Sequence, residues 1–428
     1  MTDRDDVTTD PNARTWVPAG DRDFPIQNLP YGAIVRPGER AAHLAIAIGD
    51  MALDLHVLAH AGTFDGIAPG ARALLGAPSL DALLAREPAT WRAVRAVVFD
   101  YLHARAEVSR DGALATHALV PRDAVRNVRP FTVGAYVDFY ASLEHATALG
   151  RILRPGDETP LAPNWRWLPV GYHGRASTVT CDATVARPSG QSVGPDGIPR
   201  YAPTQKLDYE LELGWITGAS SRAPLATADA RARAFGVVLL CDWSARDMQA
   251  WEYRPLGPFL AKSFATTLSP WIVTLDALAP YRCAAPRQEP PPLPHLREAG
   301  DGALDVVLDV ALRSAAMRER GDGEQIVGRA NARKLYWTIA QQLAHITSNG
   351  THLRAGDLYG TGTISDDGPG GCGSLIERTW DGTRPLALTD GTTRTFLADG
   401  DEVVMRGTAE RAGLARVGFG ELRATISG

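Results

Sequence analysis

The stretch KLDYELELGW, residues 206–215, alternates apolar and acidic side chains. Because successive side chains of a β-strand point to opposite faces, this alternation predicts a strand with one apolar face and one acidic face. The simplest interpretation is a half-buried strand whose acidic face is solvated. A second interpretation is that the acids share a cation, since like charges two residues apart on one face repel each other. The acids are Asp208, Glu210 and Glu212.

The chain around and after this stretch is typical of a mostly β structure. From about residue 129 the sequence is rich in Gly, Pro and β-branched residues, with many short strand-like runs between turns. Such spacing favours antiparallel β architecture over a doubly wound α/β fold. Two helices are predicted: one over ASLEHATALG, begun by Ser142 and ended by Gly150, and one over ANARKLYWTIAQQLAHITSNG, ended by Gly350.

The region before this part has a different character. Residues 1–20 form a polar lead, and strand-like segments at Tyr31–Val35 and Leu44–Ile48 precede helix-like stretches at 71–86 and 90–108. This pattern predicts a small α+β unit. The segment RNVRPF, with Pro130, is the expected joint to the rest of the chain, because proline discourages a helix from continuing across it.

The composition describes an ordinary soluble globular chain. Of its 428 residues, 45% are hydrophobic and 22% are charged, and the net charge is −5. This charge gives no reason to expect nucleic acid or an anionic membrane as a partner. The N-terminal sequence lacks the features of a signal peptide and no apolar run approaches the ~20 residues of a membrane helix, so we expect a cytoplasmic protein. The four cysteines lie far apart without a CxxC pair, which predicts neither a zinc ribbon nor a disulfide framework.

Two further acids have apolar neighbours in the sequence, so a solvated position on the surface does not suit them. Asp242 follows the apolar run GVVLLC, and Asp138 lies among aromatic and aliphatic residues in AYVDFYASLEH. Each alone is more often a helix cap or an ion-pair partner. With Glu210 and Glu212 they would form an all-oxygen set, which suits Mg²⁺, Ca²⁺ or Mn²⁺ better than zinc. The spacing leaves open whether the four converge.

Candidate groups for chemistry lie near these acids. His145 follows Asp138 by seven residues, so the two share a helix face if a helix begins that early. After Asp242, the positive and amide side chains of Arg246, Gln249 and Lys262 are of the kind that stabilises a developing oxyanion. The structural alternative for this segment is an amphipathic helix over 244–251 followed by a turn at 255–258.

A series of sequence blocks occurs in a fixed order along nearly the whole chain. The blocks are FPIQNLPYG, DFYASLEHATALGRILR, LPVGYHGRAS, KLDYELELGW, CDWSARDMQAWEYRPLGPFLAKSFATTLSPW, GTGTIS and SLIERTWDG. In these blocks the chain resembles the fumarylacetoacetate hydrolase family, and the resemblance implies a mostly β (α+β) protein. It also implies a small SH3-like barrel domain over residues 21–128 and a large C-terminal catalytic β-roll domain over 129–428, with two chains forming a homodimer.

The resemblance also implies which residues hold a metal. The divalent cation, Mg²⁺ or Ca²⁺ with Mn²⁺ as a further candidate, is expected on Asp138, Glu210, Glu212 and Asp242. A second cation in relatives touches the positions of Lys262 and Thr266 together with that of Asp242. Asp208 is not among the ligands, and we expect it to make a structural contact.

Catalytic and substrate-binding roles follow from the same resemblance. His145 is the expected catalytic histidine and Glu377 its orienting carboxylate, while Arg246, Gln249 and Lys262 are expected to stabilise the oxyanion. Three departures from the family pattern, Thr361, Asp366 and Arg378, are expected to affect the rim of the site. The expected substrate contacts are Tyr140, Arg154, Tyr172, Gln249, Tyr253 and Thr363.

The activity that the resemblance implies is metal-dependent hydrolysis of a carbon–carbon bond in a small β-diketo acid. The expected substrate is fumarylacetoacetate, which would give fumarate and acetoacetate, the last step of tyrosine and phenylalanine degradation. A sister enzyme that acts on acylpyruvates or related keto acids is one alternative. A non-catalytic protein that keeps the fold and the metal is another, although the complete His, Glu, Arg, Gln and Lys set argues against it. An assay on fumarylacetoacetate beside acylpyruvates separates these hypotheses.

Overall fold

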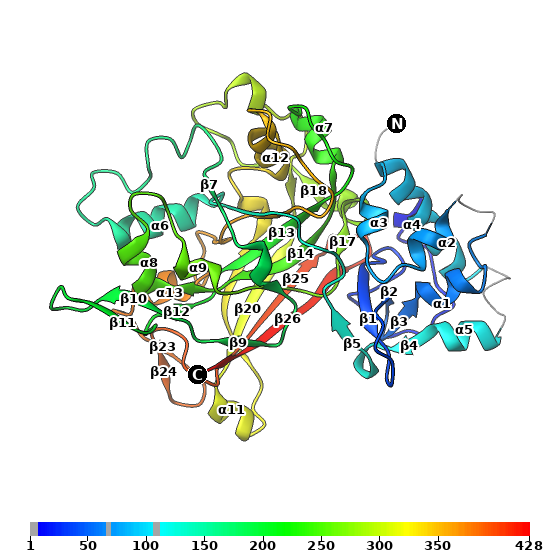
Figure 1. Cartoon of the computed structure of the whole chain (residues 1–428), viewed down its shortest axis with the longest axis horizontal. Helices are drawn as coiled ribbons and strands as arrows, with labels where there is room; N and C mark the ends of the chain where they lie inside the picture. Colours follow the sequence, from blue (N-terminus) through cyan, green and yellow to red (C-terminus); the bar gives the residue numbers. More distant parts are fainter. Residues whose placement is uncertain (1–6, 66–69, 106–111) are drawn as a thin grey trace.

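The N-terminal domain is built on a five-stranded antiparallel sheet with the order β4-β3-β2-β1-β5. The computed structural model describes residues 7–65, 70–105 and 112–428, and this domain lies at the right of Figure 1. Its strands are β1 (Tyr31–Val35), β2 (His43–Ile48), β3 (Met51–Asp54), β4 (Leu119–Pro121) and β5 (Arg126–Val128), and its helices are α1 (Leu55–His60), α2 (Ala71–Leu75), α3 (Asp81–Leu84), α4 (Pro88–Leu102) and α5 (Gly112–Ala118).

The sequence predictions for this domain are partly confirmed. The strand predicted at Tyr31–Val35 is present, and the one predicted from Leu44 begins one residue earlier. The helix expected over 71–86 is wrong, because Gly76 and Pro78 separate α2 from α3. The helix expected over 90–108 ends at Leu102, and residues 106–108 lie outside the described part of the chain.

The C-terminal domain contains two large sheets that pack on each other. The eight-stranded sheet has the order β7-β6-β22-β13-β14-β16-β8, with β17 also paired to β14, and the five-stranded sheet has the order β21-β20-β25-β26-β9. The first consists of β6 (Tyr136–Phe139), β7 (Gly171–His173), β8 (Val179–Thr180), β13 (Leu211–Thr217), β14 (Ala234–Asp242), β16 (Thr266–Leu268), β17 (Val273–Thr274) and β22 (Leu358–Gly360). The second consists of β9 (Thr184–Ala186), β20 (Val307–Arg313), β21 (Gln325–Asn331), β25 (Glu402–Ala409) and β26 (Val417–Ser427).

Smaller elements complete this domain around the two sheets, and Figure 1 shows α6, α8 and α9 gathered at one end of the eight-stranded sheet. The paired short strands are β10 (Ser189–Val193) with β11 (Pro199–Pro203), β12 (Leu207–Asp208) with β15 (Ser244–Ala245), β18 (Arg282–Cys283) with β19 (Ala303–Leu304), and β23 (Leu386–Ala387) with β24 (Thr393–Arg394). The helices are α6 (Leu143–Leu153), α7 (Thr227–Ala232), α8 (Arg246–Glu252), α9 (Leu260–Ser263), α10 (Leu275–Leu278), α11 (Ala315–Glu319), α12 (Ile339–Thr347) and α13 (Leu375–Thr379).

Strand β14 shows why the eight-stranded sheet is buried on both faces. Val237 and Leu239 belong to the hydrophobic core between the two sheets, whereas Val238 and Leu240 belong to the core shared with the N-terminal domain. Alternate side chains point to opposite faces, so both faces are covered by protein. This double burial explains the uninterrupted apolar sequence of the strand.

The opening stretch differs from the expectation in two ways. It is not one strand, because β12 ends at Asp208 and β13 begins at Leu211. Its acidic side is not solvated either, since Asp208, Glu210 and Glu212 are all buried. The solvated-face interpretation is therefore wrong: alternation identifies two faces, but it does not reveal what covers the second one.

The predicted helices of the C-terminal domain need three corrections. Helix α6 begins after Ser142, as predicted, but continues past Gly150 to Leu153. Gly150 instead permits close packing, since a Cβ there would collide with the carbonyl of Pro160. Helix α12 covers only the second half of the segment 330–350, and α8 begins at Arg246 because residues 244 and 245 form β15.

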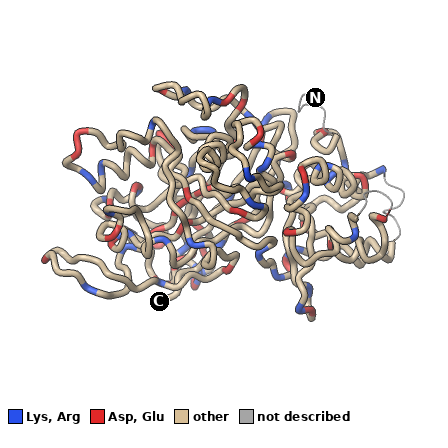
Figure 2. Tube along the Cα trace, turned by 45° about the horizontal axis from the view of Figure 1, so that its top comes forward, with Lys and Arg blue, Asp and Glu red and all other residues tan. Residues whose placement is uncertain are grey.

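Charged residues of both signs are interspersed along both domains, as Figure 2 shows. In the described part of the chain, no helix has the length and apolar character needed to cross a membrane.

Candidate active site

Four carboxylates converge at one end of the eight-stranded sheet, and we call this group the acid cage. One oxygen of each lies within 4.8 Å of an oxygen of every other, and all four side chains are buried. The cage arises from neighbouring strands, because β13 lies between β14 and β22, and β22 pairs with β6. Its members are Asp138 on β6, Glu210 just before β13, Glu212 on β13 and Asp242 at the end of β14.

Two glycines allow the carboxylates to approach each other. A Cβ at Gly360 on β22 would collide with the carboxylates of Asp138 and Glu212. The backbone N–H of Gly362 donates to Asp138 Oδ1 at 3.1 Å and to Glu212 Oε2 at 3.0 Å. Gly362 has a φ of +75°, a conformation that other residues rarely adopt. The GTGTIS segment thus closes one side of the cage with backbone.

The electrostatics of the cage favour a bound cation. Burial, together with the neighbouring carboxylates, raises the pKa of Asp138 and of Glu212 well above the usual range. Glu212 Oε1 is buried without a hydrogen-bond partner among the described residues. An unpaired buried carboxylate oxygen is costly, and a hard divalent ion with oxygen ligands would satisfy it. The residues present therefore fit such an ion.

Lys262 and Arg246 lie against the same group of acids. Lys262 Nζ is 2.7 Å from Glu210 Oε2 and 2.9 Å from Asp242 Oδ2, and Arg246 Nη1 is 2.7 Å from Glu210 Oε1. Burial alone would raise the pKa of the Glu210 carboxyl. The positive charges of Lys262 and Arg246 outweigh burial and hold this pKa below its usual value. Arg246 Nη1 also donates to Gln249 Oε1 at 2.9 Å, and Arg246 Nη2 has no hydrogen-bond partner in the described chain.

Asp208 connects Arg246 to a second part of the site. Its carboxylate accepts from Arg246 Nε at 2.9 Å and from the backbone N–H groups of Leu375 and Ile376 at 2.7 and 3.0 Å. These N–H groups belong to the first turn of α13, where a carboxylate is favourably placed. Asp208 therefore fixes the position of Arg246 relative to the helix that carries Glu377.

His145 and Glu377 form a buried hydrogen-bonded pair. His145 Nδ1 lies 2.7 Å from Glu377 Oε2. The Glu377 carboxylate also accepts from Ser374 Oγ at 2.6 Å and from Ser365 Oγ at 2.9 Å. These partners outweigh burial, which alone would raise the pKa of Glu377, and hold this pKa below its usual value. Asp138 lies on a strand and His145 on α6, so the shared helix face considered from their spacing is wrong.

One cavity of ≈ 410 Å³ is lined by His145, by Arg246 and Lys262, and by two members of the acid cage, Asp138 and Glu210. Its apolar lining includes Leu149, Leu153 and Leu256, which the sequence did not single out. Thr363 Oγ1 is buried in this lining without a hydrogen-bond partner in the described residues, so it is available to a ligand. The predicted residues that line the cavity are Asp138, Tyr140, His145, Arg154, Tyr172, Glu210, Arg246, Gln249, Tyr253, Lys262 and Thr363.

The remaining predicted residues lie behind this lining. Glu377 contacts His145, and Thr266 Oγ1 is 3.5 Å from Asp242 Oδ1. Tyr172 donates its hydroxyl to Asp242 Oδ2 at 2.6 Å, so it reaches the cage as well as the cavity. The three departures from the family pattern, Thr361, Asp366 and Arg378, are not among the residues that line the cavity. Their effect on the rim of the site stays a prediction.

Ser365 and Ser374 are functional contacts that the sequence reasoning missed. Each supports Glu377, and Ser365 also accepts from the backbone N–H of Gly373 at 3.0 Å. Serines in glycine-rich loops are usually turn residues, so their type alone carries no signal. The available hint was that Ser365 ends the block GTGTIS and that Ser374 begins the block SLIERTWDG.

Comparison with known proteins identifies the family. Residues 27–130 match the family model "Fumarylacetoacetase N-terminal", and residues 134–427 match "Fumarylacetoacetate (FAA) hydrolase C-terminal". The fumarylacetoacetase of Arabidopsis thaliana is 44% identical over 406 residues, which cover 94% of this chain and 94% of the plant protein. The human fumarylacetoacetase is 41% identical over 408 residues, covering 94% of this chain and 96% of the human protein.

A solved structure supports the fold. The fumarylacetoacetate hydrolase of the psychrophile Exiguobacterium antarcticum matches with a TM-score of 0.50 and 16% identity, over 93% of this chain and 99% of that protein. The fold expected from the sequence, a mostly β protein with an N-terminal domain and a large C-terminal domain of this type, is confirmed. With both family models matched and relatives above 40% identity along almost its whole length, the chain belongs to the fumarylacetoacetate hydrolase family.

Proposed function

We propose that this chain hydrolyses fumarylacetoacetate to fumarate and acetoacetate, the last step of tyrosine and phenylalanine degradation. The observation that carries the proposal is that His145, which is hydrogen-bonded to Glu377, lines the same cavity as Asp138 and Glu210 of the acid cage. Such an arrangement places a base for water beside a site for a cation. The curated relatives named above are fumarylacetoacetases, which supports this choice of substrate.

The chemistry requires a carbanion to leave. Breaking the bond between a carbonyl carbon and the neighbouring CH₂ of a β-diketone leaves the electron pair on that CH₂. A divalent cation held by Asp138, Glu210, Glu212 and Asp242 would act as a Lewis acid that stabilises the resulting enolate. Mg²⁺ and Ca²⁺ both suit oxygen ligands, and we propose one of them as the resident ion.

His145 acts as the general base. Because its Nδ1 is engaged by Glu377, its Nε2 is the nitrogen left to accept a proton from water. The hydroxide that forms attacks the carbonyl carbon of the fumaryl group. Ser365 and Ser374 keep Glu377 in place, so the histidine ring is held in one orientation.

Arg246, Gln249 and Lys262 stabilise the negative oxygen of the tetrahedral intermediate. All three line the cavity, and the unpartnered Nη2 of Arg246 is a buried donor that is ready for an oxyanion. When the carbon–carbon bond breaks, fumarate is released and the acetoacetate enolate takes up a proton at its CH₂. Water has then supplied OH to one product and H to the other.

The remaining predicted residues bind the two carboxylates of the substrate. Arg154 offers paired donors to a planar acid, and it lines the cavity with Tyr140, Tyr253 and Thr363. Tyr172, through its contact with Asp242, links this part of the site to the acid cage. A second cation near Lys262 and Thr266 stays part of the proposal, supported by the position of Thr266 beside Asp242.

The direct test is an assay of purified protein with Mg²⁺ on fumarylacetoacetate and on acylpyruvates, followed by the loss of diketone absorbance. We expect a kcat/KM for fumarylacetoacetate at least tenfold above that for any acylpyruvate tested. A preference for an acylpyruvate would overturn the proposed substrate while leaving the site intact.

We further propose a homodimer and a cytoplasmic location, as the sequence led us to expect. The dimer is supported by an exposed apolar group next to the cavity mouth, in which Leu256 is 96% exposed and Phe259 68% exposed. Large exposed apolar side chains that cluster are typical of protein interfaces. Light scattering on a size-exclusion column tests the dimer, and Leu256→Glu should shift it toward monomer.

A further inference from the structure

Two short neighbouring helices carry the groups that are proposed to stabilise the oxyanion. Helix α8 contributes Arg246 and Gln249, and helix α9 contributes Lys262. The two helices lie next to each other, as Figure 1 shows. In the segment that connects them, residues 253 and 255–258 line the same cavity as these three groups. The spacing of the three donors therefore depends on how the segment and α9 are held against α8.

Apolar packing accounts for part of this hold. Ala261 of α9 is buried in a small cluster with Met248 of α8. In contrast, Leu256 is 96% exposed, Phe259 68% and Leu260 52%. Exposed side chains gain little from burial, so in the single chain these three contribute little to fixing the segment. Polar contacts are needed to fix the start of α9.

Glu252, the last residue of α8, supplies such a contact. Its Oε1 accepts hydrogen bonds from the backbone N–H of Phe259 at 2.9 Å and from that of Ala261 at 2.7 Å. Phe259 is the N-cap residue of α9, and its side chain has no oxygen that could accept a bond from the first turn. Glu252 takes over this capping role from α8, and its negative charge suits the N–H groups at a helix N-terminus. One carboxylate thus joins the end of α8 to the start of α9.

The effect of Glu252 on the site is indirect. Glu252 is not among the described residues that line the cavity, so it is not placed to contact a substrate there. Lys262 directly follows Ala261, and its Nζ lies 2.7 Å from Glu210 Oε2 in the acid cage. A displacement of a catalytic group by about 1 Å can cost about 100-fold in rate. The hold of Glu252 on α9 therefore bears on the position of Lys262.

We propose that Glu252 is a positioning residue that sets the place of Lys262 relative to Arg246 and Gln249. This inference rests on the function proposed above, because it assumes that the three groups act on one oxyanion. The carboxylate serves as an acceptor for two backbone N–H groups, and it has no part in proton transfer. An amide oxygen at the same position can accept these bonds, whereas a methyl group cannot.

Amide hydrogen exchange of the full chain measures the hold of Glu252 on α9 directly. In Glu252→Ala, we expect the N–H groups of Phe259 and Ala261 to exchange about tenfold faster or more, because they lose their acceptor. Amides of the buried strand β14 should keep their protection. In Glu252→Gln, exchange at both positions should stay within about threefold of that in the unmodified chain.

Steady-state kinetics measure the consequence for the site. In Glu252→Ala, kcat should fall about 10- to 100-fold while KM changes less than about threefold, because groups that act on the intermediate are displaced. Glu252→Gln should restore kcat to within about threefold of normal. Glu319→Ala, at the exposed end of α11, is the matched control and should keep both normal exchange and normal kcat.

Hydrogen exchange needs no substrate, so it separates a failure of this inference from a failure of the proposed function. Unchanged exchange at Phe259 and Ala261 in Glu252→Ala would overturn the positioning role whatever the substrate is. Faster exchange throughout β14 would also overturn it, because Glu252 would then stabilise the domain in general. So would an equal loss of kcat in both Glu252 variants, since the acceptor would not be what matters.

Discussion

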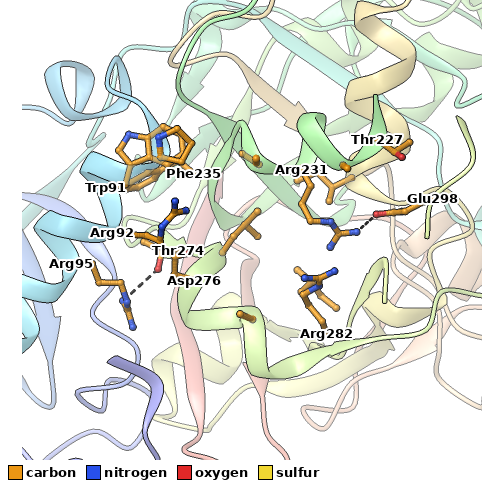
Figure 3. Close-up of a pocket in the computed structure, with 18 of the residues that line it drawn as sticks. Trp91, Arg92, Arg95, Thr227, Arg231, Phe235, Thr274, Asp276, Arg282 and Glu298 are labelled. Carbon is orange, nitrogen blue, oxygen red and sulfur yellow. Dashed lines mark hydrogen bonds and ion pairs between the residues drawn. The ribbon is translucent and has the colours of Figure 1, made fainter. Parts of the chain in front are cut away.

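Two regions of the molecule bring charged side chains together, and they differ in the balance and the burial of that charge. The acid cage holds four buried carboxylates whose oxygens lie within 4.8 Å of one another. The cavity between the two domains (Figure 3) is lined by five arginines and two carboxylates, and among the arginines Arg95 is buried while Arg92 and Arg297 are exposed. Repulsion between buried charges is screened far less than repulsion between exposed ones. The difference teaches that the acid cage is the region that needs a counter-ion.

Breaking the cage should give the largest effect. Glu212→Gln keeps the side-chain shape but removes a ligand charge, and Glu212 Oε1 has no partner among the described residues to compensate. We expect loss of the bound cation and a fall in turnover on the order of 1,000-fold, since Lewis-acid stabilisation contributes several kcal/mol. Metal analysis and kcat on the same preparation measure both.

The control for this variant is Glu289→Gln, whose side chain is 67% exposed in a surface loop. It should keep both the cation and the activity. A Glu212→Gln protein that turns over normally without a cation would show that the cage is not a metal site.

The next largest effect distinguishes the role of His145 as a base from the role of the acid cage. His145→Ala removes the proton acceptor, so we expect kcat to fall about 100- to 10,000-fold while the cation content stays normal. His295→Ala, at an exposed position, is the matched control. Loss of the cation from the His145→Ala protein would instead make His145 a ligand or a structural residue.

A smaller effect is expected at Asp208, which connects Arg246 to helix α13. Asp208→Asn weakens the hold on Arg246 and on the first turn of α13. We expect kcat to fall about tenfold with the cation retained, and the free energy of unfolding to fall by about 3 kcal/mol because a buried ion pair loses one partner. Steady-state kinetics and urea unfolding measure these changes. A change in KM alone would argue against a positioning role for Asp208.

The smallest effect concerns pH. Burial and neighbouring carboxylates raise the pKa of Asp138 and Glu212 in the folded chain. Above the ordinary carboxyl pKa of about 4 the cation-free folded chain thus holds more protons than the unfolded chain, and its stability falls as pH rises. A cation replaces those protons, so stabilisation by Mg²⁺ should grow as pH rises above the ordinary carboxyl pKa. Thermal unfolding with and without Mg²⁺ measures this, and a pH-independent Mg²⁺ effect would refute it.

The sequence predicted the cage better than its surroundings. The alternation of KLDYELELGW separates apolar from acidic side chains correctly, because strand geometry has a period of two. It could not reveal that the acidic side is also buried, since that depends on Gly362 and on neighbouring strands far away in the chain. The family resemblance supplied the ligand set, and the structure brings these four residues together.

Other features could not be predicted from the sequence, for physical reasons. Asp138 lies on strand β6 and His145 lies on helix α6, which follows it. Their relative position therefore cannot be deduced from residue spacing along a single helix. The arginines that line the cavity between the two domains come from segments as far apart as Arg92 and Arg297, so no local pattern marks them. The individual catalytic roles and the domain limits at residues 20 and 128 stay predictions.

The central claim is that a divalent cation in the acid cage is required for hydrolysis of fumarylacetoacetate. The most direct measurement follows turnover of the chelator-treated protein as Mg²⁺ is added back, with bound Mg²⁺ counted in the same samples. We predict that turnover is absent without the ion and rises in proportion to Mg²⁺ bound by the unmodified chain. Full turnover of protein that contains no divalent cation would contradict the account.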